Sequence, residues 1–172
     1  MLTQPLAAEY GEGFANYINL VPAGDLREML AEQLEHTTEL FANLSKEQGD
    51  YRYAPGKWSI KEVIGHIADT ERVMAYRLLR IARGDQTPLP GFDENLFMSG
   101  STFDSMPLSE LIEDYRAVRE STLTLLRGLT DEAVLRTGTS NNATISARAL
   151  AYMIAGHELH HLNVLKERYL GE

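Results

Sequence analysis

The sequence predicts an all-α protein built as a four-helix bundle with long crossover connections. Three observations lead to this prediction. Four segments of about 18–24 residues repeat apolar side chains at steps of three and four, as the core-facing side of a helix does. No segment alternates apolar and polar residues in the manner of a half-buried strand, and the chain contains no internal repeat. We expect neighbouring helices to run antiparallel; the alternative is a less regular, orthogonal all-α domain.

The first two predicted helices have clear beginnings. The first runs from about Asp25 to Leu44, and Asp25 is a residue type that caps helix N-termini. The second opens at Ser59, where Glu62 completes a capping box, because the Ser side chain accepts the Glu62 amide proton and the Glu side chain accepts the Ser59 amide proton. This helix is expected to stop near Gly84.

The last two predicted helices end at glycines. The third follows Pro107 and ends by Gly128. The fourth runs from Thr144 or Ser146 to about Leu170, before a final glycine.

The remaining segments are too rich in apolar residues to be simple tails or linkers. Residues 1–24 contain Tyr10, Phe14 and Tyr17, so we expect an N-terminal arm that packs on the bundle or on a partner subunit, and residues 25–172 form the helical domain. The long connection 84–106 is expected to be an ordered crossover that walls a cleft.

Composition excludes several classes of protein. The chain has 172 residues, 16 Lys and Arg against 25 Asp and Glu, a net charge of −9, five histidines and no cysteine. Its length fits one domain. The negative charge argues against general nucleic-acid binding, and the lack of cysteine excludes disulfides, Cys-type zinc sites and a cysteine nucleophile. Without a leader sequence or a membrane-spanning segment, we expect a cytoplasmic protein.

Two histidines of the fourth helix are candidate metal ligands. His157 and His161 are four residues apart on the apolar stripe, which places them on one face about 6 Å apart along the helix axis. At this spacing two imidazoles can share a metal ion. The equally weighted alternative is a pair of ordinary histidines, one in the core and one partly exposed. His160 belongs to a neighbouring face.

The same segment matches the His-Glu-x-x-His pattern of metalloproteases, with Glu158 as the general base. We reject this interpretation, because only eleven residues follow His161 to supply a third ligand and no strand is predicted to lie above the helix.

His66 is the other histidine on a strongly apolar helix face. Asp69 or Glu71 could accept a hydrogen bond from the distal N–H of a metal-bound imidazole and thereby fix its tautomer, or either could be a solvated charge. His36 lies among glutamates and is expected at the surface.

The second helix carries further candidates. We interpret Trp58 as a hydrophobic anchor where the helix begins, with substrate stacking as the minority alternative. Arg77, Arg80 and Arg83 form a basic side that is expected to be solvated, although it could meet an acidic thiol cosubstrate.

Four sequence segments resemble the DinB/YfiT-like superfamily of metal-binding four-helix proteins. They are residues 53–59 (YAPGKWS), 62–71 (EVIGHIADTE), 88–94 (PLPGFDE) and 155–161 (AGHELHH). The resemblance spans roughly residues 20–170 and identifies residues 25–172 as a DinB-like domain.

The resemblance implies that His66, His157 and His161 bind one divalent metal ion, nickel or zinc, and that His160 lies beside the site without being a ligand. It also implies a small-molecule substrate, because some members of the superfamily are S-transferases that use a low-molecular-weight thiol and others are named metal-dependent hydrolases. In a protein without cysteine, such a thiol must be a diffusible cosubstrate.

Three functions are therefore compatible with the sequence. The first is metal-dependent transfer of a thiol to an electrophilic small molecule, since a metal ion binds a thiol as the nucleophilic thiolate. The second is hydrolysis by a metal-bound hydroxide. The third is a non-catalytic, metal-binding, stress-associated homodimer in which the aromatic arm supplies the contact between subunits.

Overall fold

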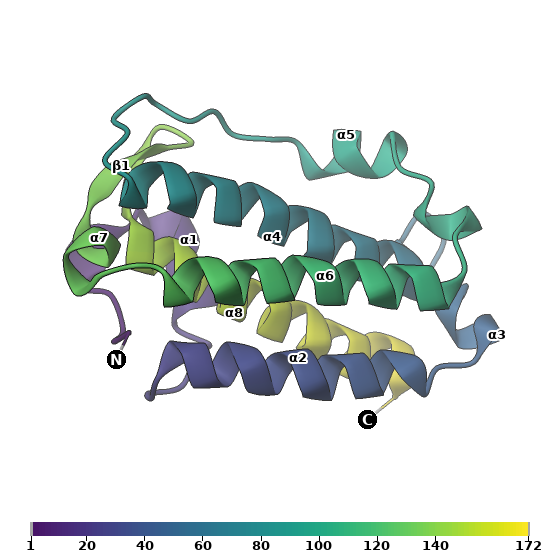
Figure 1. Ribbon diagram of the computed structural model, residues 1–172. Coiled ribbons are helices and arrows are strands. Elements are labelled where there is room, and N and C mark those ends of the chain that lie inside the picture. Colours follow the sequence, from purple (N-terminus) through teal and green to yellow (C-terminus); the bar gives the residue numbers. More distant parts are fainter. Residues whose placement is uncertain (1, 172) are drawn as a thin grey trace.

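Four long helices form the body of the computed structural model, which describes residues 2–171 (Figure 1). They are α2 (Leu26–Ala42), α4 (Ile60–Ala82), α6 (Leu108–Arg127) and α8 (Ala147–Val164). The predicted four-helix bundle with long crossover connections is confirmed. Met1, the first residue of the predicted arm, and Glu172, the last residue of the predicted domain, lie outside the described residues.

The helices begin where side chains satisfy their free amide groups. Asp25 accepts a hydrogen bond from the Arg27 amide, and the capping box of Ser59 and Glu62 is formed. Ser146 caps α8 in the same way. After α8 the chain continues as a π-helical segment, η3 (Leu165–Leu170).

The order of the helices in space differs from their order in the chain. α4 packs against α6 and α8, and α2 packs against the same two helices. Consecutive long helices therefore lie across the bundle from each other in two cases, α2 with α4 and α6 with α8. The expectation that all neighbours run antiparallel is wrong for two packed pairs, α4 with α6 and α2 with α8. At the beginning of α4 and α6 Ser59 donates to Asp104, just before α6, and near their end Arg136 donates to the Ala82 carbonyl. In the other pair Gln33 donates to the Ala155 carbonyl, and one turn further on Thr37 donates to Glu158.

The parallel direction of α4 and α6 explains the long crossover, because residues 84–106 must return along the whole length of α4 before α6 can begin (Figure 1). This segment contains α5 (Glu94–Ser99) and η2 (Phe103–Ser105). The shorter connection from α2 to α4 contains α3 (Lys46–Gly49).

A small β-hairpin precedes α8, whereas no strand was predicted. β1 (Thr137–Ser140) pairs antiparallel with β2 (Ala143–Ser146), after a short helix α7 (Asp131–Leu135). Asn141 and Asn142, the two loop residues, both have positive φ, as a tight two-residue hairpin turn requires. Four-residue strands are too short to show a clear alternation of apolar and polar residues. The sequence signal for this hairpin was therefore the Asn-Asn pair of its turn.

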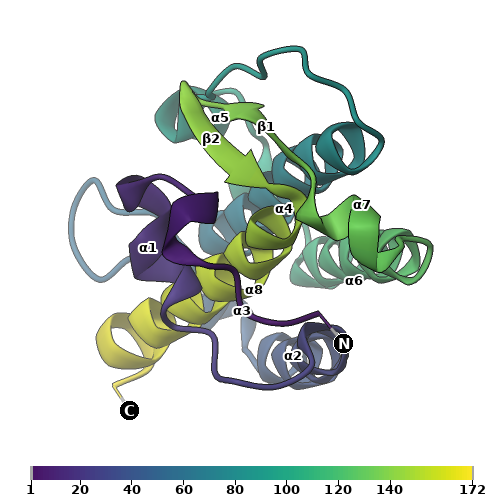
Figure 2. The same cartoon turned by 90° about the vertical axis from the view of Figure 1, so that its left-hand side faces the viewer.

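The N-terminal segment lies along α8 (Figure 2). It contains η1 (Ala7–Glu9) and α1 (Glu12–Ile18). Glu9 accepts hydrogen bonds from Arg148 and Ser146 at the beginning of α8. Further along, the Tyr17 carbonyl lies against Gly156, where a Cβ atom would stand 2.1 Å from the carbonyl oxygen.

A layer of buried polar residues divides the apolar core into two halves. One half gathers around Leu78 and Leu150, and the other around Ile64 and Leu111. Seven buried polar residues of α4, α6 and α8 fall between these halves, and they are His66, Thr70, Glu71, Arg119, Thr122, His157 and Glu158. Two further buried polar residues of α4, Lys61 and Arg77, lie nearer the ends of that helix. Among the helices of residues 2–171, none is both long and apolar enough to cross a membrane.

Replacing Glu9 by glutamine should lower the free energy of unfolding by about 1 kcal/mol at neutral pH, since solvent screens an ion pair near the surface. Burial alone would raise the pKa of Glu9, but hydrogen bonds from Arg148, the Leu6 amide and Ser146 outweigh it and lower the pKa to about 2. The contribution of the carboxylate is therefore complete above its ordinary pKa of 4.5 and is lost as the pH falls towards 2.

Denaturant unfolding of the wild type and of Glu9→Gln between about pH 7 and pH 3 measures this difference. It should shrink below about pH 4.5, whereas the exposed control Glu120→Gln should change little at any pH. A Glu9→Gln difference that does not depend on pH would contradict the assignment.

Candidate metal centre

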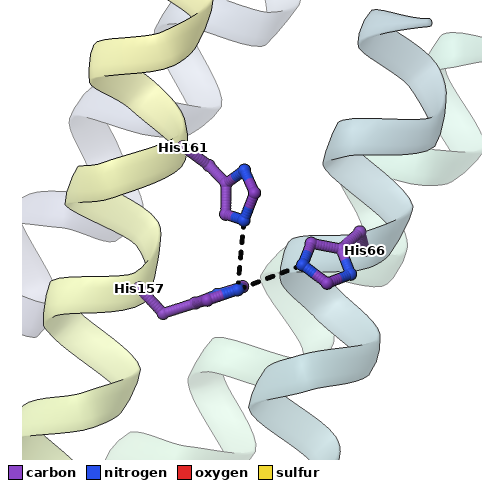
Figure 3. A group of neighbouring side chains, drawn as sticks. All are labelled: His66, His157 and His161. Carbon is purple, nitrogen blue, oxygen red and sulfur yellow. Dashed lines mark hydrogen bonds between the residues drawn. The ribbon is translucent and has the colours of Figure 1, made fainter. Parts of the chain in front are cut away.

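Three histidines from two helices converge in the polar layer (Figure 3). His66 comes from α4, and His157 and His161 come from successive turns of α8. The Nε2 atom of His157 lies 3.1 Å from the Nε2 atoms of both His66 and His161. The structure therefore brings together the three residues that the resemblance proposed as ligands.

The electrostatics of the cluster keep its imidazoles neutral. Burial, followed by the neighbouring histidines, lowers the pKa of His66 to about 4 and that of His161 to about 3. The same causes hold the pKa of His157 well below its ordinary value. A neutral imidazole presents a nitrogen lone pair, which is the form that binds metal.

The geometry fits one small divalent ion. Three nitrogens that each stand 2.0–2.1 Å from a tetrahedral ion lie about 3.3 Å from one another. The two Nε2 separations of 3.1 Å are close to this value, and the possible ligand atoms of all three histidines lie within 4.8 Å of one another. Three buried imidazoles facing one another without a shared ion would leave lone pairs poorly satisfied.

The acidic residues expected to orient His66 make other contacts. Asp69 pairs with Arg72 at 3.3 Å on the side of the bundle where Arg72 also binds Asp114 of α6. Glu71 turns towards Arg119. Neither carboxylate accepts a hydrogen bond from a histidine among the described residues, because both face α6 rather than α8.

His160 and two aromatic residues surround the cluster. The exposed His160 ring meets His161 edge-on, with centroids 5.0 Å apart, and it meets Tyr17 at 5.3 Å. Trp58 stands over His66 at 4.8 Å and packs on the apolar core, which agrees with the predicted anchor. Tyr17 and Trp58 thus cover the imidazoles from two sides. His36 is exposed, as expected.

Glu158 is directed away from the histidines into a buried ionic network. Its carboxylate accepts hydrogen bonds from Thr37, Tyr115 and Arg119, and Arg119 also binds Glu71 at 2.8 Å. The network connects all four long helices. Glu158 is fully buried and engaged, so it cannot serve as the base of a metalloprotease, which supports the rejection of that interpretation.

The part that Arg119, Tyr115 and Thr37 play in this network was not predicted from the sequence. Burial alone would lower the pKa of Arg119, but Glu71 and Glu158 outweigh it and raise the pKa well above its ordinary value. The available signal was the presence of Arg119 on the apolar stripe of the third predicted helix.

Two separate cavities are each lined by part of the histidine cluster. The crossover cavity, about 460 Å³, reaches His66 and His157. The C-terminal cavity, about 270 Å³, reaches His161 and His160. The crossover cavity is also lined by Phe14, Tyr17, Thr70, Met74, Arg77, Gly91, Phe92, Asp93, Glu94, Asn141 and Met153. The C-terminal cavity is also lined by Tyr53, Gly56, Lys57, Trp58, Val63, Asn95, Val164 and Tyr169.

Arg77, Arg80 and Arg83 do not share the solvated face that was expected. Arg83 is exposed, and Arg80 binds Asp85 near the surface. Arg77 is only 4% exposed and lines the crossover cavity. Three-residue steps on a helix carry successive side chains around the axis, so Arg77 reaches the inner side.

Comparisons with known proteins identify the family of this chain. A family model described as the DinB superfamily matches residues 29–165. A protein of Oceanobacillus iheyensis named "Putative metal-dependent hydrolase" is 28% identical over 147 residues, covering 83% of this chain and 84% of the relative. A protein of Bacillus pumilus with the same name is 26% identical over 143 residues, covering 81% of each.

Two solved structures share the fold. The first, YfiT from Bacillus subtilis, described as "a probable metal-dependent hydrolase with an unusual four-helix bundle topology", matches with a TM-score of 0.69 and 21% identity, over 95% of this chain and 89% of its own. The second, a mycothiol-dependent maleylpyruvate isomerase, matches with a TM-score of 0.64 and 15% identity, over 84% of this chain and 61% of its own.

Proposed function

Because the chain belongs to the DinB superfamily, we propose that it is a metal-dependent enzyme that transfers a low-molecular-weight thiol to an electrophilic small molecule. In this proposal His66, His157 and His161 hold one divalent ion, nickel or zinc. Held by three neutral imidazoles, the ion would keep open positions and would bind a thiol in its nucleophilic thiolate form.

The observation that carries this proposal is that two separate cavities border one histidine cluster. A transfer reaction needs two reactants side by side, and each cavity reaches a different pair of histidines. The cavity volumes suit small molecules. The name of the mycothiol-dependent structural neighbour lends support, since that protein also depends on a thiol.

Residues of the chain have separate tasks in such a reaction. The three imidazoles come from only two helices, and the ionic network of Arg119 joins those helices through Glu71 on α4 and Glu158 on α8. The rings of Tyr17 and Trp58 pack against His157 and His66 and would limit the contact of these imidazoles with water outside the cavities. Exclusion of water strengthens the electrostatic interactions in a site and limits competing hydrolysis.

The second candidate is metal-dependent hydrolysis, which the names of the two sequence relatives favour. With Glu158 engaged in the network, this reaction would lack the general base of the His-Glu-x-x-His pattern. The two candidates differ in whether a thiol is consumed.

Single replacement of His66, His157 or His161 by alanine should reduce bound nickel or zinc to a small fraction of the wild-type content, because two imidazoles hold such ions far more weakly than three. Elemental analysis of the purified proteins measures the metal. His36→Ala is the matched control, since His36 is exposed on α2 and should leave the metal content unchanged.

The reaction is tested on metal-loaded wild type with several thiols and a generic electrophile such as monochlorobimane. Thiol consumption that disappears with the metal supports transfer. Release of product from ester or amide substrates without thiol would instead favour hydrolysis. Metal binding without either reaction would favour a non-catalytic, stress-associated protein. Unchanged metal content in all three histidine variants would contradict the assignment of these histidines as metal ligands.

We also propose a homodimer and a cytoplasmic location, as expected from the sequence. Light scattering of the purified protein at several concentrations tests the dimer, and fractionation of source cells tests the location.

A further inference from the structure

We propose that Arg77 binds a carboxylate of the ligand in the crossover cavity, and that this cavity therefore selects an elongated, carboxylate-bearing small molecule. The inference rests on the proposed function in one respect, namely that this ligand is one of the two reactants.

Arg77 is a buried cation without a counterion. It is 4% exposed and lines the crossover cavity, and it forms no ion pair with a carboxylate among residues 2–171. Burial lowers the pKa of its guanidinium, and no carboxylate offsets the effect. Burying an unpaired charge is costly, so an anion that enters the cavity would be strongly favoured.

The contacts that Arg77 does make leave donors free. One terminal nitrogen donates to the Pro90 carbonyl at 2.6 Å, and the other reaches the Met74 sulfur at 3.6 Å, a weak acceptor. The guanidinium carbon stands 5.6 Å from the Phe92 ring centroid. Two protein contacts use only part of five N–H donors, and a neutral side chain could hold Pro90 without burying a charge.

A second polar group in the same cavity also lacks a partner. The hydroxyl of Thr70 is buried and has no hydrogen-bond partner among the described residues. Thr70 lies one turn from His66 and two turns from Arg77. A polar ligand that extends from Arg77 towards the histidines would pass this hydroxyl, and it could satisfy a group that otherwise remains unpaired.

The acidic residues of the cavity do not replace the missing counterion. Asp93 and Glu94 line the cavity but are exposed, and Asp93 accepts hydrogen bonds from the Asn95 and Leu96 amides at the start of α5. The guanidinium is enclosed, whereas these carboxylates lie at the solvent side. The charge pattern therefore favours an anionic group inside.

The spacing along α4 sets the length of the ligand. His66, Thr70, Met74 and Arg77 follow one another at steps of four, four and three on the cavity side. Eleven residues of helix rise about 16 Å, and Arg77 reaches back to Met74, so the carboxylate and the histidine cluster are separated by roughly 10–15 Å. A single amino acid is too short to join these points.

Binding of octanoate, octylamine and 1-octanol to metal-free protein tests the proposal by calorimetry or NMR titration. Metal-free protein is used so that the result does not depend on the ion. Wild type should bind octanoate about tenfold or more tightly than octylamine. Arg77→Gln should lose about tenfold or more in octanoate affinity, and Arg77→Lys should fall between the two.

The matched control is Arg80→Gln, because Arg80 lies on the same helix but is paired with Asp85 outside the cavity. It should bind octanoate within about twofold of wild type. Equal binding of octanoate by folded Arg77→Gln and wild type overturns the proposal. If Arg77→Gln does not fold, the proposal is tested by comparing the affinities of wild type and Arg77→Lys for octanoate and octylamine. Octylamine binding that is as tight as octanoate binding, or tighter, overturns the proposal.

Kinetics on protein loaded with zinc or nickel then distinguish the two reactants. If the thiol carries the carboxylate, Arg77→Gln should raise the KM for 8-mercaptooctanoate but not that for 1-octanethiol. If the electrophile carries it, the same selective rise should appear with 8-bromooctanoate against 1-bromooctane. Arg77-dependent octanoate binding without any thiol turnover would support the carboxylate site and reject the thiol-transfer function. A failure of the carboxylate site can therefore be distinguished from a failure of the proposed function.

Discussion

Arg119→Met is expected to lower the free energy of unfolding by about 3–5 kcal/mol, because removing one member of a buried ionic network leaves the others without a counter-charge. Arg119 is fully buried and donates to Glu71, Glu158 and the Leu30 carbonyl. Without it, two carboxylates from different helices would face each other in the core. A loss of this size is a large part of the 5–15 kcal/mol that typically stabilises a domain.

Denaturant unfolding at neutral pH measures this loss. Arg116→Met is the matched control, because Arg116 is exposed on the same helix, and it should change the stability by about 0.5 kcal/mol or less. A triple variant that adds Glu71→Gln and Glu158→Gln should recover part of the stability, since it removes the unpaired charges. If Arg119→Met were no less stable than Arg116→Met, the network would not hold the helices together.

Gly156→Ala is expected to displace α1 from α8. The new Cβ atom would stand 2.1 Å from the Tyr17 carbonyl oxygen, and backbone cannot move aside as a flexible side chain can. Overpacking of this kind costs about 1–3 kcal/mol or more, which exceeds the gain of about 1 kcal/mol from replacing glycine by alanine in a helix. We expect a net loss of about 1–2 kcal/mol and weaker protection of residues 2–24 from proteolysis.

Gly13→Ala is the control for this prediction. Gly13 lies in α1, and no atom would stand within 4 Å of its added Cβ, so the variant should be stabilised by up to about 1 kcal/mol. Thermal unfolding and limited proteolysis of the two variants compare them directly. Gly156→Ala with a proteolysis pattern like that of Gly13→Ala would mean that α1 is not seated on Gly156.

Much of the fold could be predicted from local signals. The apolar stripes and capping residues located the four long helices. Ser59 caps α4 as expected, and of the two expected beginnings of the fourth helix, Thr144 and Ser146, it is Ser146 that caps α8. Periodicity carries no information on the direction of a neighbouring helix, which is why the parallel pairs, α4 with α6 and α2 with α8, were not predicted. The hairpin before α8 depends on two asparagines with positive φ and on pairing too short to leave a pattern.

In the candidate site, too, some features could be predicted from the sequence and others depend on contacts between helices. The spacing of His157 and His161 indicated one pair of candidate ligands, and the resemblance to the DinB family added His66. The structure brings the three residues together, and their role as ligands remains our proposal. The partners of Asp69 and Glu71 were not predictable. Glu71 pairs with Arg119, which lies on α6, and Asp69 pairs with Arg72, which is turned towards Asp114 of α6. A helix taken alone does not reveal which neighbour each polar side chain meets.

The polar layer across the core also limits how the helices can slide along one another. Apolar stripes with a regular repeat would pack almost equally well if α8 moved by one turn, about 5.4 Å. Such a slip would carry Glu158 away from Arg119 and Tyr115 and bury its charge among aliphatic side chains on either side of the layer. We therefore expect the buried charges to select a single alignment of the bundle, which sets the height at which the three histidines meet.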